Sequence, residues 1–209
     1  MFGANEKRNS VPKKAFNETG NYPIEYRIDQ IKNLKELRSL NIASNALVSI
    51  DEIESITGPI MGRPKSATFR TADVVGIDTL VKVATGVAEN CPNDEAKATF
   101  KLPSWLEKMV AQNWLGDKTG QGFFKKVKTA TSKEILTLNL ATLEYEPRKK
   151  TKMASIDAAK AVDNLPARLK VLYHSKDKAG QFIQAFHHAL FSYISHRIPE
   201  ISDELYRVD

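Results

Sequence analysis

Three cationic side chains stand close together in the stretch Gly58 to Leu80, which reads GPIMGRPKSATFRTADVVGIDTL. Arg63, Lys65 and Arg70 lie in a segment punctuated by glycine and proline, directly before an apolar run. A loop that only reverses the chain does not need this charge. Because guanidinium and ammonium groups bind phosphate strongly, the three cations predict either a site for an anionic ligand or a solvated loop rim.

Other motifs that carry chemistry are missing from the sequence. It has neither the G-x-G-x-x-G fingerprint of dinucleotide-binding folds nor a P-loop. Gly120-x-Gly122 comes nearest, but it precedes a predicted strand. A pyrophosphate is bound where a glycine-rich turn leads into the N-terminus of a helix. No metal-ligand spacing of Cys and His occurs, and His187 and His188 are interpreted as packing or surface residues of an apolar helix. We therefore predict no catalytic, cofactor-binding or metal-binding residue in this chain.

Composition limits the class of protein. The chain has 209 residues, 42% of them hydrophobic, which allows one domain with a core of its own. Its net charge of +6 and pI of about 9.3 favour an anionic partner. The single cysteine, Cys91, excludes an internal disulfide framework and is typical of a reducing compartment. No stretch of about 18 apolar residues predicts a membrane span, and the first residues lack the core of a secretory signal. We therefore expect a cytoplasmic protein.

Apolar residues recur every three or four positions over most of the chain, which is the period of amphipathic helices. The predicted helices lie at 24–47, within 48–116 (three helices), and at 155–164, 166–174 and 178–197. A polar and basic arm precedes the first of them. The sequence therefore predicts a mainly α protein.

Local signals predict where some of these helices begin. Capping-box sequences, in which a serine is followed three residues later by glutamate, start at Ser49 and at Ser104. For the helix between them, Thr71 or Asp73 is expected to supply the N-terminal cap.

Three short runs interrupt the helical pattern. They read GFFKKV at 122–127, EILTLN at 134–139 and TLEYEP at 142–147, and the first two are separated by a polar turn. β-branched and aromatic residues bounded by polar turns are typical of strands. The predicted fold is therefore mainly α with a small antiparallel β insertion near 122–147.

Two longer motifs carry a family resemblance. In TGPIMGRPKSATFRTADVVGIDTLVKVA the distinctive residues are Gly58, Pro59, Gly62, Asp73, Gly76 and Asp78. In NWLGDKTGQGFFKK they are Leu115, Gly116, Lys118, Thr119, Gly120, Gly122, Phe123 and Phe124. Both motifs resemble the C-terminal domain of bacterial 3-hydroxyacyl-CoA dehydrogenases of fatty-acid β-oxidation. The stretch from Asp177 onward resembles the second helical repeat of the long-chain subgroup, so the resemblance covers roughly residues 48–209.

The resemblance implies a domain organisation. Residues 48–147 are expected to form the dehydrogenase C-terminal-like helical domain with the small sheet, and residues 148–209 the truncated start of a second helical repeat. Residues 1–47 are expected to be a basic arm and a diverged amphipathic helix. In the family, NAD is bound by a Rossmann domain that also supplies a His–Glu catalytic pair. Neither is visible here, so the chain is expected to be a fragment that binds no cofactor alone.

The resemblance also implies an identity for the anionic ligand. It implies an acyl-CoA substrate, which carries a diphosphate and a 3′-phosphate. The side chains expected to bind these phosphates are Arg63, Lys65, Arg70 and Lys118. Two alternatives stay open: the first three can form a solvated rim, and Lys118 can be a cation near the C-terminal end of a helix dipole. The run RKKTK at 148–152 is interpreted as a solvated face.

Three functions are considered, of which two are compatible with these patterns. The first is part of an NAD-dependent 3-hydroxyacyl-CoA dehydrogenase, contributing substrate binding and dimerisation, with the NAD-binding portion as a partner if it is encoded separately. The second is a non-catalytic acyl-CoA-binding or scaffold remnant. The third, nucleic-acid binding, is rejected because the cations are not interleaved with aromatics in a recognisable module.

Self-association is expected from the last predicted helix. Its apolar stripe from Phe182 to Ile194 belongs to a repeat that stops at Asp209. An apolar face without its usual cover tends to bind another surface, so we expect a homo-oligomer.

Overall fold

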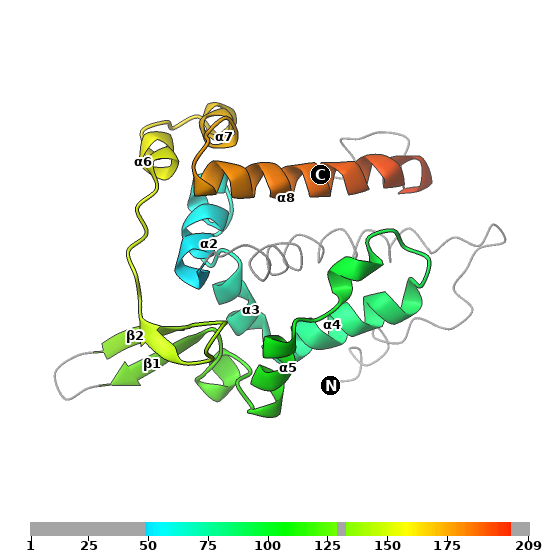
Figure 1. The fold of residues 1–209 in the computed structure, drawn as a ribbon, viewed down its shortest axis with the longest axis vertical. Helices are drawn as coiled ribbons and strands as arrows, with labels where there is room; N and C mark the ends of the chain where they lie inside the picture. The colour runs from blue at the N-terminus through cyan, green and yellow to red at the C-terminus, as the bar shows by residue number, and fades with distance from the viewer. Residues whose placement is uncertain (1–48, 129–132, 202–209) are drawn as a thin grey trace, which may run out of the picture.

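The computed structural model describes residues 49–128 and 133–201. They form helices, 3-10 turns and one three-stranded sheet (Figure 1). In chain order the elements are α2 (Ile50–Thr57), η2 (Pro59–Met61), α3 (Phe69–Val75), α4 (Ile77–Asn90), η3 (Lys97–Phe100), α5 (Ser104–Ala111), η4 (Asp117–Thr119), β1 (Phe124–Lys128), β2 (Lys133–Leu138), β3 (Tyr145–Pro147), α6 (Ala154–Lys160), α7 (Leu165–Tyr173) and α8 (Lys178–Ile201). The predicted class, mainly α with a small antiparallel sheet, is confirmed. The arm and helix expected over 1–47 lie outside the described residues.

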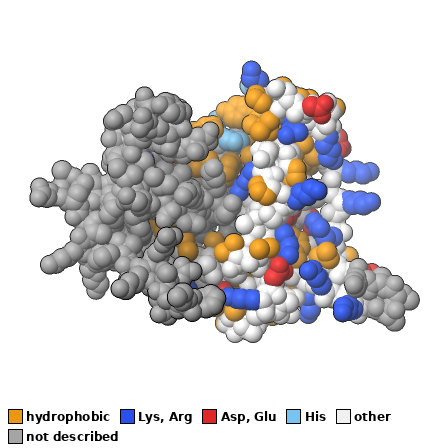
Figure 2. Space-filling view, turned by 180° about the vertical axis from the view of Figure 1, so that it is seen from behind, with side chains coloured by type: hydrophobic (Ala, Val, Ile, Leu, Met, Phe, Trp, Pro, Cys, Tyr) orange, Lys and Arg blue, Asp and Glu red, His pale blue; other side chains and the backbone are white. Residues whose placement is uncertain are grey.

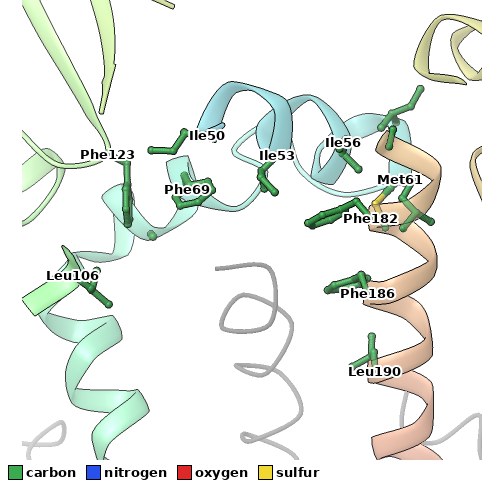
Figure 3. Packing of buried hydrophobic residues seen from close by; sticks show 14 of the residues in the cluster. Ile50, Ile53, Ile56, Met61, Phe69, Leu106, Phe123, Phe182, Phe186 and Leu190 are labelled. Carbon is green, nitrogen blue, oxygen red and sulfur yellow. The ribbon is translucent and has the colours of Figure 1, made fainter. Parts of the chain in front are cut away.

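Helix α2 begins at the predicted capping box and supplies the centre of the core. The Ser49 hydroxyl accepts a hydrogen bond from the Glu52 N–H at 3.3 Å, and the Glu52 carboxylate accepts one from the Ser49 N–H at 2.7 Å. Ile50, Ile53 and Ile56 follow at helical spacing, and all three are buried. Figure 3 shows these three side chains between Phe69, Phe123 and Leu106 at one end and α8 at the other.

The apolar face of α8 is covered, which corrects one expectation. Phe182, Phe186 and Leu190 keep only 4%, 4% and 5% of their surface exposed. Phe182 lies beside Met61 and belongs to the same hydrophobic cluster as α2 (Figure 3). Phe191, which was expected in the same stripe, is 56% exposed. The expectation that this face lacks cover is therefore wrong, and self-association does not follow from it.

The helix expected after the 58–68 loop is divided into α3 and α4. Gly76, with φ of 102°, separates them, a conformation that favours glycine. Because α3 already begins at Phe69, Thr71 and Asp73 lie inside it and cap nothing, contrary to prediction. The Thr71 hydroxyl instead donates to the Ala67 carbonyl at 2.7 Å.

The second predicted capping box is also wrong. Pro103 occupies the N-cap position of α5, and Ser104 is the first helical residue, with no side-chain cap bond. The proline ring fixes φ near −65°, and its ψ of 144° brings the chain into the helix from extended backbone. Ser104 therefore stands one position too late to accept from the first turn.

The sheet has the order β1-β2-β3 with antiparallel pairing throughout. Lys126 on β1 is paired with Ile135 on β2, and Phe124 with Thr137. Because alternate residues of a strand share a face, these four side chains lie on one face of the sheet.

The chain after β3 links the sheet to the C-terminal helices. This segment runs along the edge of the molecule to α6 (Figure 1, yellow). The hydrophobic cluster includes Leu138 and Phe123 from the sheet region as well as Met153, Ile156 and Leu172 beyond it. The core therefore continues across residue 147. Within the described residues, no helix combines the length and apolar character needed to cross a membrane.

Candidate functional site

An open groove of about 1420 Å³ lies between the sheet, α2, α3 and the segment that follows β3. Its cationic lining residues are Lys65, Arg70, Lys126, Arg148, Lys149, Lys150, Lys152 and Lys160. Its acidic lining residues are Asp51, Glu54, Asp117 and Asp157. Eight cations against four carboxylates leave the described lining with a surplus of positive charge. Figure 2 shows Lys and Arg side chains spread over the side of the molecule that carries the sheet and α6.

The groove brings together two of the four predicted site residues. Lys65 and Arg70 line it, whereas Arg63 and Lys118 are not among its lining residues. Arg63 is half-buried in the loop that precedes α3. Lys118 lies in η4, where its ammonium group is paired with the carboxylate of Asp78 at the start of α4.

Arg70 is already engaged by a carboxylate. Its two guanidinium nitrogens donate to the two carboxylate oxygens of Asp117, each at 2.6 Å. This bidentate geometry is the strong form of an Arg–carboxylate pair. The hydrogen bonds between the two side chains hold the pKa of Asp117 below its usual range. The same bonds raise the pKa of Arg70. An anion that enters the groove therefore meets Arg70 with part of its charge compensated.

The other carboxylates of the groove are also committed to donors. Asp51 accepts from the Lys149 N–H at 2.8 Å and from the Arg148 side chain at 3.1 Å. Glu54 accepts from the N–H groups of Thr68 at 3.1 Å and Phe69 at 2.6 Å. Burial raises the pKa of Glu54 to about 7, against the opposing effect of these donors. Asp51 and Asp117 are therefore paired with arginine side chains, whereas the partners of Glu54 are uncharged N–H groups. Asp117 also interacts electrostatically with Lys126.

Both family-like motifs of the sequence meet at Asp73. Its carboxylate accepts from the Phe123 N–H at 2.8 Å and from the Phe124 N–H at 2.9 Å. Burial raises the pKa of Asp73 to about 6, while the two N–H donors oppose that rise. A Cβ on Gly122 would lie 2.2 Å from the Asp73 carboxylate, and a Cβ on Gly116 would lie 2.3 Å from the Asp73 carbonyl oxygen. The two glycines therefore permit the close approach that holds α3 against the strand entering the sheet.

Sequence reasoning missed most of the cations that line the groove. Lys126 was not singled out, and the run 148–152 was interpreted as a solvated face. The signal was the run itself, RKKTK, whose first three residues and last lysine all line the groove together with Lys65. Their position depends on the path of the chain after β3, which local patterns do not specify.

Two of the three histidines of α8, His187 and His188, have local partners. His187 is half-buried, and its Nδ1 lies 2.9 Å from the Ile183 carbonyl oxygen. Burial lowers the pKa of His187. His188 lies 2.5 Å from the Tyr173 hydroxyl. Among the described side chains, no group of three or more His, Cys, Asp or Glu residues is placed to hold a metal ion.

Comparison with known proteins gives a consistent picture. Residues 37–126 match the family model described as "3-hydroxyacyl-CoA dehydrogenase, C-terminal domain". A "Probable 3-hydroxyacyl-CoA dehydrogenase" of Bacillus subtilis (strain 168) is 41% identical over 160 residues, which are 77% of this chain and 20% of that protein. A protein of the same name from Deinococcus radiodurans is 48% identical over 77 residues, 37% of this chain and 21% of that protein. The chain thus spans about a fifth of the length of these relatives. No solved structure gives a significant match.

The matched segment contains both halves of the Asp73 junction. It includes helices α2 to α5 and the residues Gly116, Gly122 and Phe123 that close on Asp73. Over residues 37–126 the chain is therefore similar to the C-terminal domain of 3-hydroxyacyl-CoA dehydrogenases.

Proposed function

We propose that this chain is part of an NAD-dependent 3-hydroxyacyl-CoA dehydrogenase of fatty-acid β-oxidation, to which it contributes acyl-CoA binding and association with a second copy. In that reaction the carbon bearing the 3-hydroxyl gives a hydride to NAD, the hydroxyl gives a proton to a base, and a 3-ketoacyl-CoA is formed. The observation that carries the proposal is the 41% identity over 160 residues to a relative named for this activity.

The described residues do not fit NAD. A dinucleotide needs a glycine-rich turn that opens a helix toward its pyrophosphate. Gly120 and Gly122 precede β1, and the space beside Gly122 is filled by the Asp73 carboxylate. A buried acid at that place would repel a pyrophosphate. We therefore assign no step of hydride transfer to these residues, and we place NAD on another portion of the enzyme.

The charge of the groove supports a role in binding the CoA ester. Lys65 is exposed and lines the groove, so its ammonium group can reach phosphate oxygens. Arg70 also lines the groove, but its guanidinium group is paired with Asp117. Arg63 and Lys118 remain predicted ligands outside the groove lining. For Lys118 the pairing with Asp78 favours a structural role that competes with phosphate binding.

Calorimetry of acetoacetyl-CoA with the purified chain tests the proposal. We expect binding whose affinity falls as salt is raised, because ions screen phosphate contacts. Lys65→Ala should weaken binding by about five- to tenfold, which corresponds to about 1 kcal/mol for a lost charge-assisted contact. Lys108→Ala is the control, since Lys108 is exposed on α5 and outside the groove lining. The two variants should melt within a degree or so of each other, because exposed charges contribute little to folding.

Three results would contradict the proposal. They are no binding of the ester, binding that salt does not weaken, and equal losses in the Lys65 and Lys108 variants. Light scattering tests the proposed association with a second copy. A monomer at every accessible concentration would count against that association.

A further inference from the structure

Four lysines of the groove stand apart from its other cations. Lys65, Lys126, Lys150 and Lys152 are all exposed, and within the described residues none of them forms an ion pair or a side-chain hydrogen bond. We call them the groove lysines. The remaining cations of the lining are paired with carboxylates, as Arg70 is with Asp117. The groove lysines are therefore the ones whose charge is available to a ligand.

These lysines come from three separate segments and surround a hollow. Lys65 precedes α3, Lys126 is on β1, and Lys150 and Lys152 follow β3. Charges placed around a concave surface focus a positive potential inside it more than charges on a flat patch do. A small anion with several charged groups therefore fits this arrangement better than an extended flat surface.

The sheet adds an apolar floor beside the charge. Lys126 is paired across the strands with Ile135, which is 44% exposed, and Phe124 lies on the same face two residues before Lys126. Both apolar side chains line the groove. The Arg148 guanidinium lies 5.4 Å from the centre of the Phe124 ring. A ring on the ligand would find stacking and apolar contacts here, next to the lysines.

We propose that the groove lysines, with Phe124 and Ile135, form a site for a nucleotide that carries two or more phosphates. The phosphates lie among Lys126, Lys150 and Lys152, and the base lies over the apolar floor. The choice of CoA among such nucleotides rests on the proposed function, because CoA ends in a 3′-phosphorylated ADP. The preference for a nucleotide polyphosphate rests on the groove alone.

Calorimetry with ATP as the probe tests the site itself, because ATP has the base and phosphates but no pantetheine. The double variant Lys150→Gln, Lys152→Gln should weaken ATP binding at least tenfold, and Lys126→Gln about threefold. Lys126→Arg should retain affinity. Lys125→Gln is the matched control, since Lys125 is the preceding residue on β1 and its ammonium lies over the Tyr145 ring outside the groove lining. Adenosine, which lacks phosphate, should bind far more weakly than ATP.

The proposal is overturned if ATP does not bind, if adenosine binds as tightly, or if the Lys125 and Lys126 variants behave alike. Sedimentation with phosphatidylserine vesicles identifies the competing case, since vesicle binding lost in the double variant without any ATP binding would make the groove a membrane surface. Competition by CoA separates the two proposals. Displacement of ATP by CoA supports both, whereas ATP binding that CoA leaves unchanged supports the nucleotide site and contradicts the proposed function.

Discussion

Gly116→Ala is expected to lower the free energy of unfolding by about 2–6 kcal/mol, from overpacking and backbone strain together. The new Cβ would lie 2.3 Å from the Asp73 carbonyl oxygen and 2.7 Å from its Cα, both backbone atoms of α3 that cannot turn aside. Overpacking of this kind costs about 1–3 kcal/mol. The backbone of Gly116, with φ of 94° and ψ of −147°, adds about 1–3 kcal/mol for any residue with a side chain, because only glycine adopts this conformation readily. Urea unfolding followed by circular dichroism measures the loss, and a variant too unstable to purify would be compared with wild type by thermal melting in lysate.

Two other glycines provide controls for this prediction. Gly120 also has positive φ, at 72°, but a Cβ added there would have no atom of the described residues within 4 Å, so Gly120→Ala should cost only about 1 kcal/mol. Gly86 is inside α4 with equally open space, so Gly86→Ala should stabilise by about 0.5–1 kcal/mol. If Gly116→Ala costs no more than Gly120→Ala, the close contact between the two motifs is wrong.

Asp73→Ala should cost about 2 kcal/mol at neutral pH, since it leaves the N–H groups of Phe123 and Phe124 without their acceptor in a buried junction. Asp78→Ala is the matched control. Asp78 is half-buried and pairs with Lys118 near the surface, so its loss should cost less than about 1 kcal/mol. Equal losses in the two variants would mean that the junction contributes no more than a surface ion pair.

The Asp73 prediction has a pH dependence. Burial raises the pKa of the folded carboxyl to about 6, above that of an unfolded aspartate. The folded state therefore binds more protons between these two pKa values, and the pH-dependent part of the stability that this group contributes is lost as pH rises through about 6. Asp73→Ala removes that contribution. The gap in unfolding free energy between wild type and variant should therefore widen as pH is lowered from 7 toward 4. A gap that narrows on acidification would mean that the two N–H donors dominate the pKa.

The order and type of the elements could be predicted from the sequence, because they depend on local periodicity. The apolar spacing in α2 and α8 and the three short strand patterns are confirmed. The Ser49 cap is confirmed as well, since it depends on residues three apart. Helix boundaries near Asp73 and Ser104 were wrong because a glycine break and a proline cap override the capping signal there.

The candidate site depended on contacts that no local pattern contains. Asp73 bonds to residues 50 and 51 positions later, so its role could not be distinguished from that of a cap. The groove joins Lys65 to Lys126 and to the run after β3, segments separated by tens of residues. The sequence shows that these cations exist. These cations come together in the groove only because β1 pairs with β2 and because the chain after β3 passes α2.

A crystal structure of the chain with CoA bound is the most direct test that this domain binds its substrate through the groove. We expect the phosphates of CoA within hydrogen-bonding distance of Lys126 and of Lys150 or Lys152, with the adenine over Ile135. CoA held instead at Arg63 or Lys118, with only solvent in the groove, would contradict this assignment.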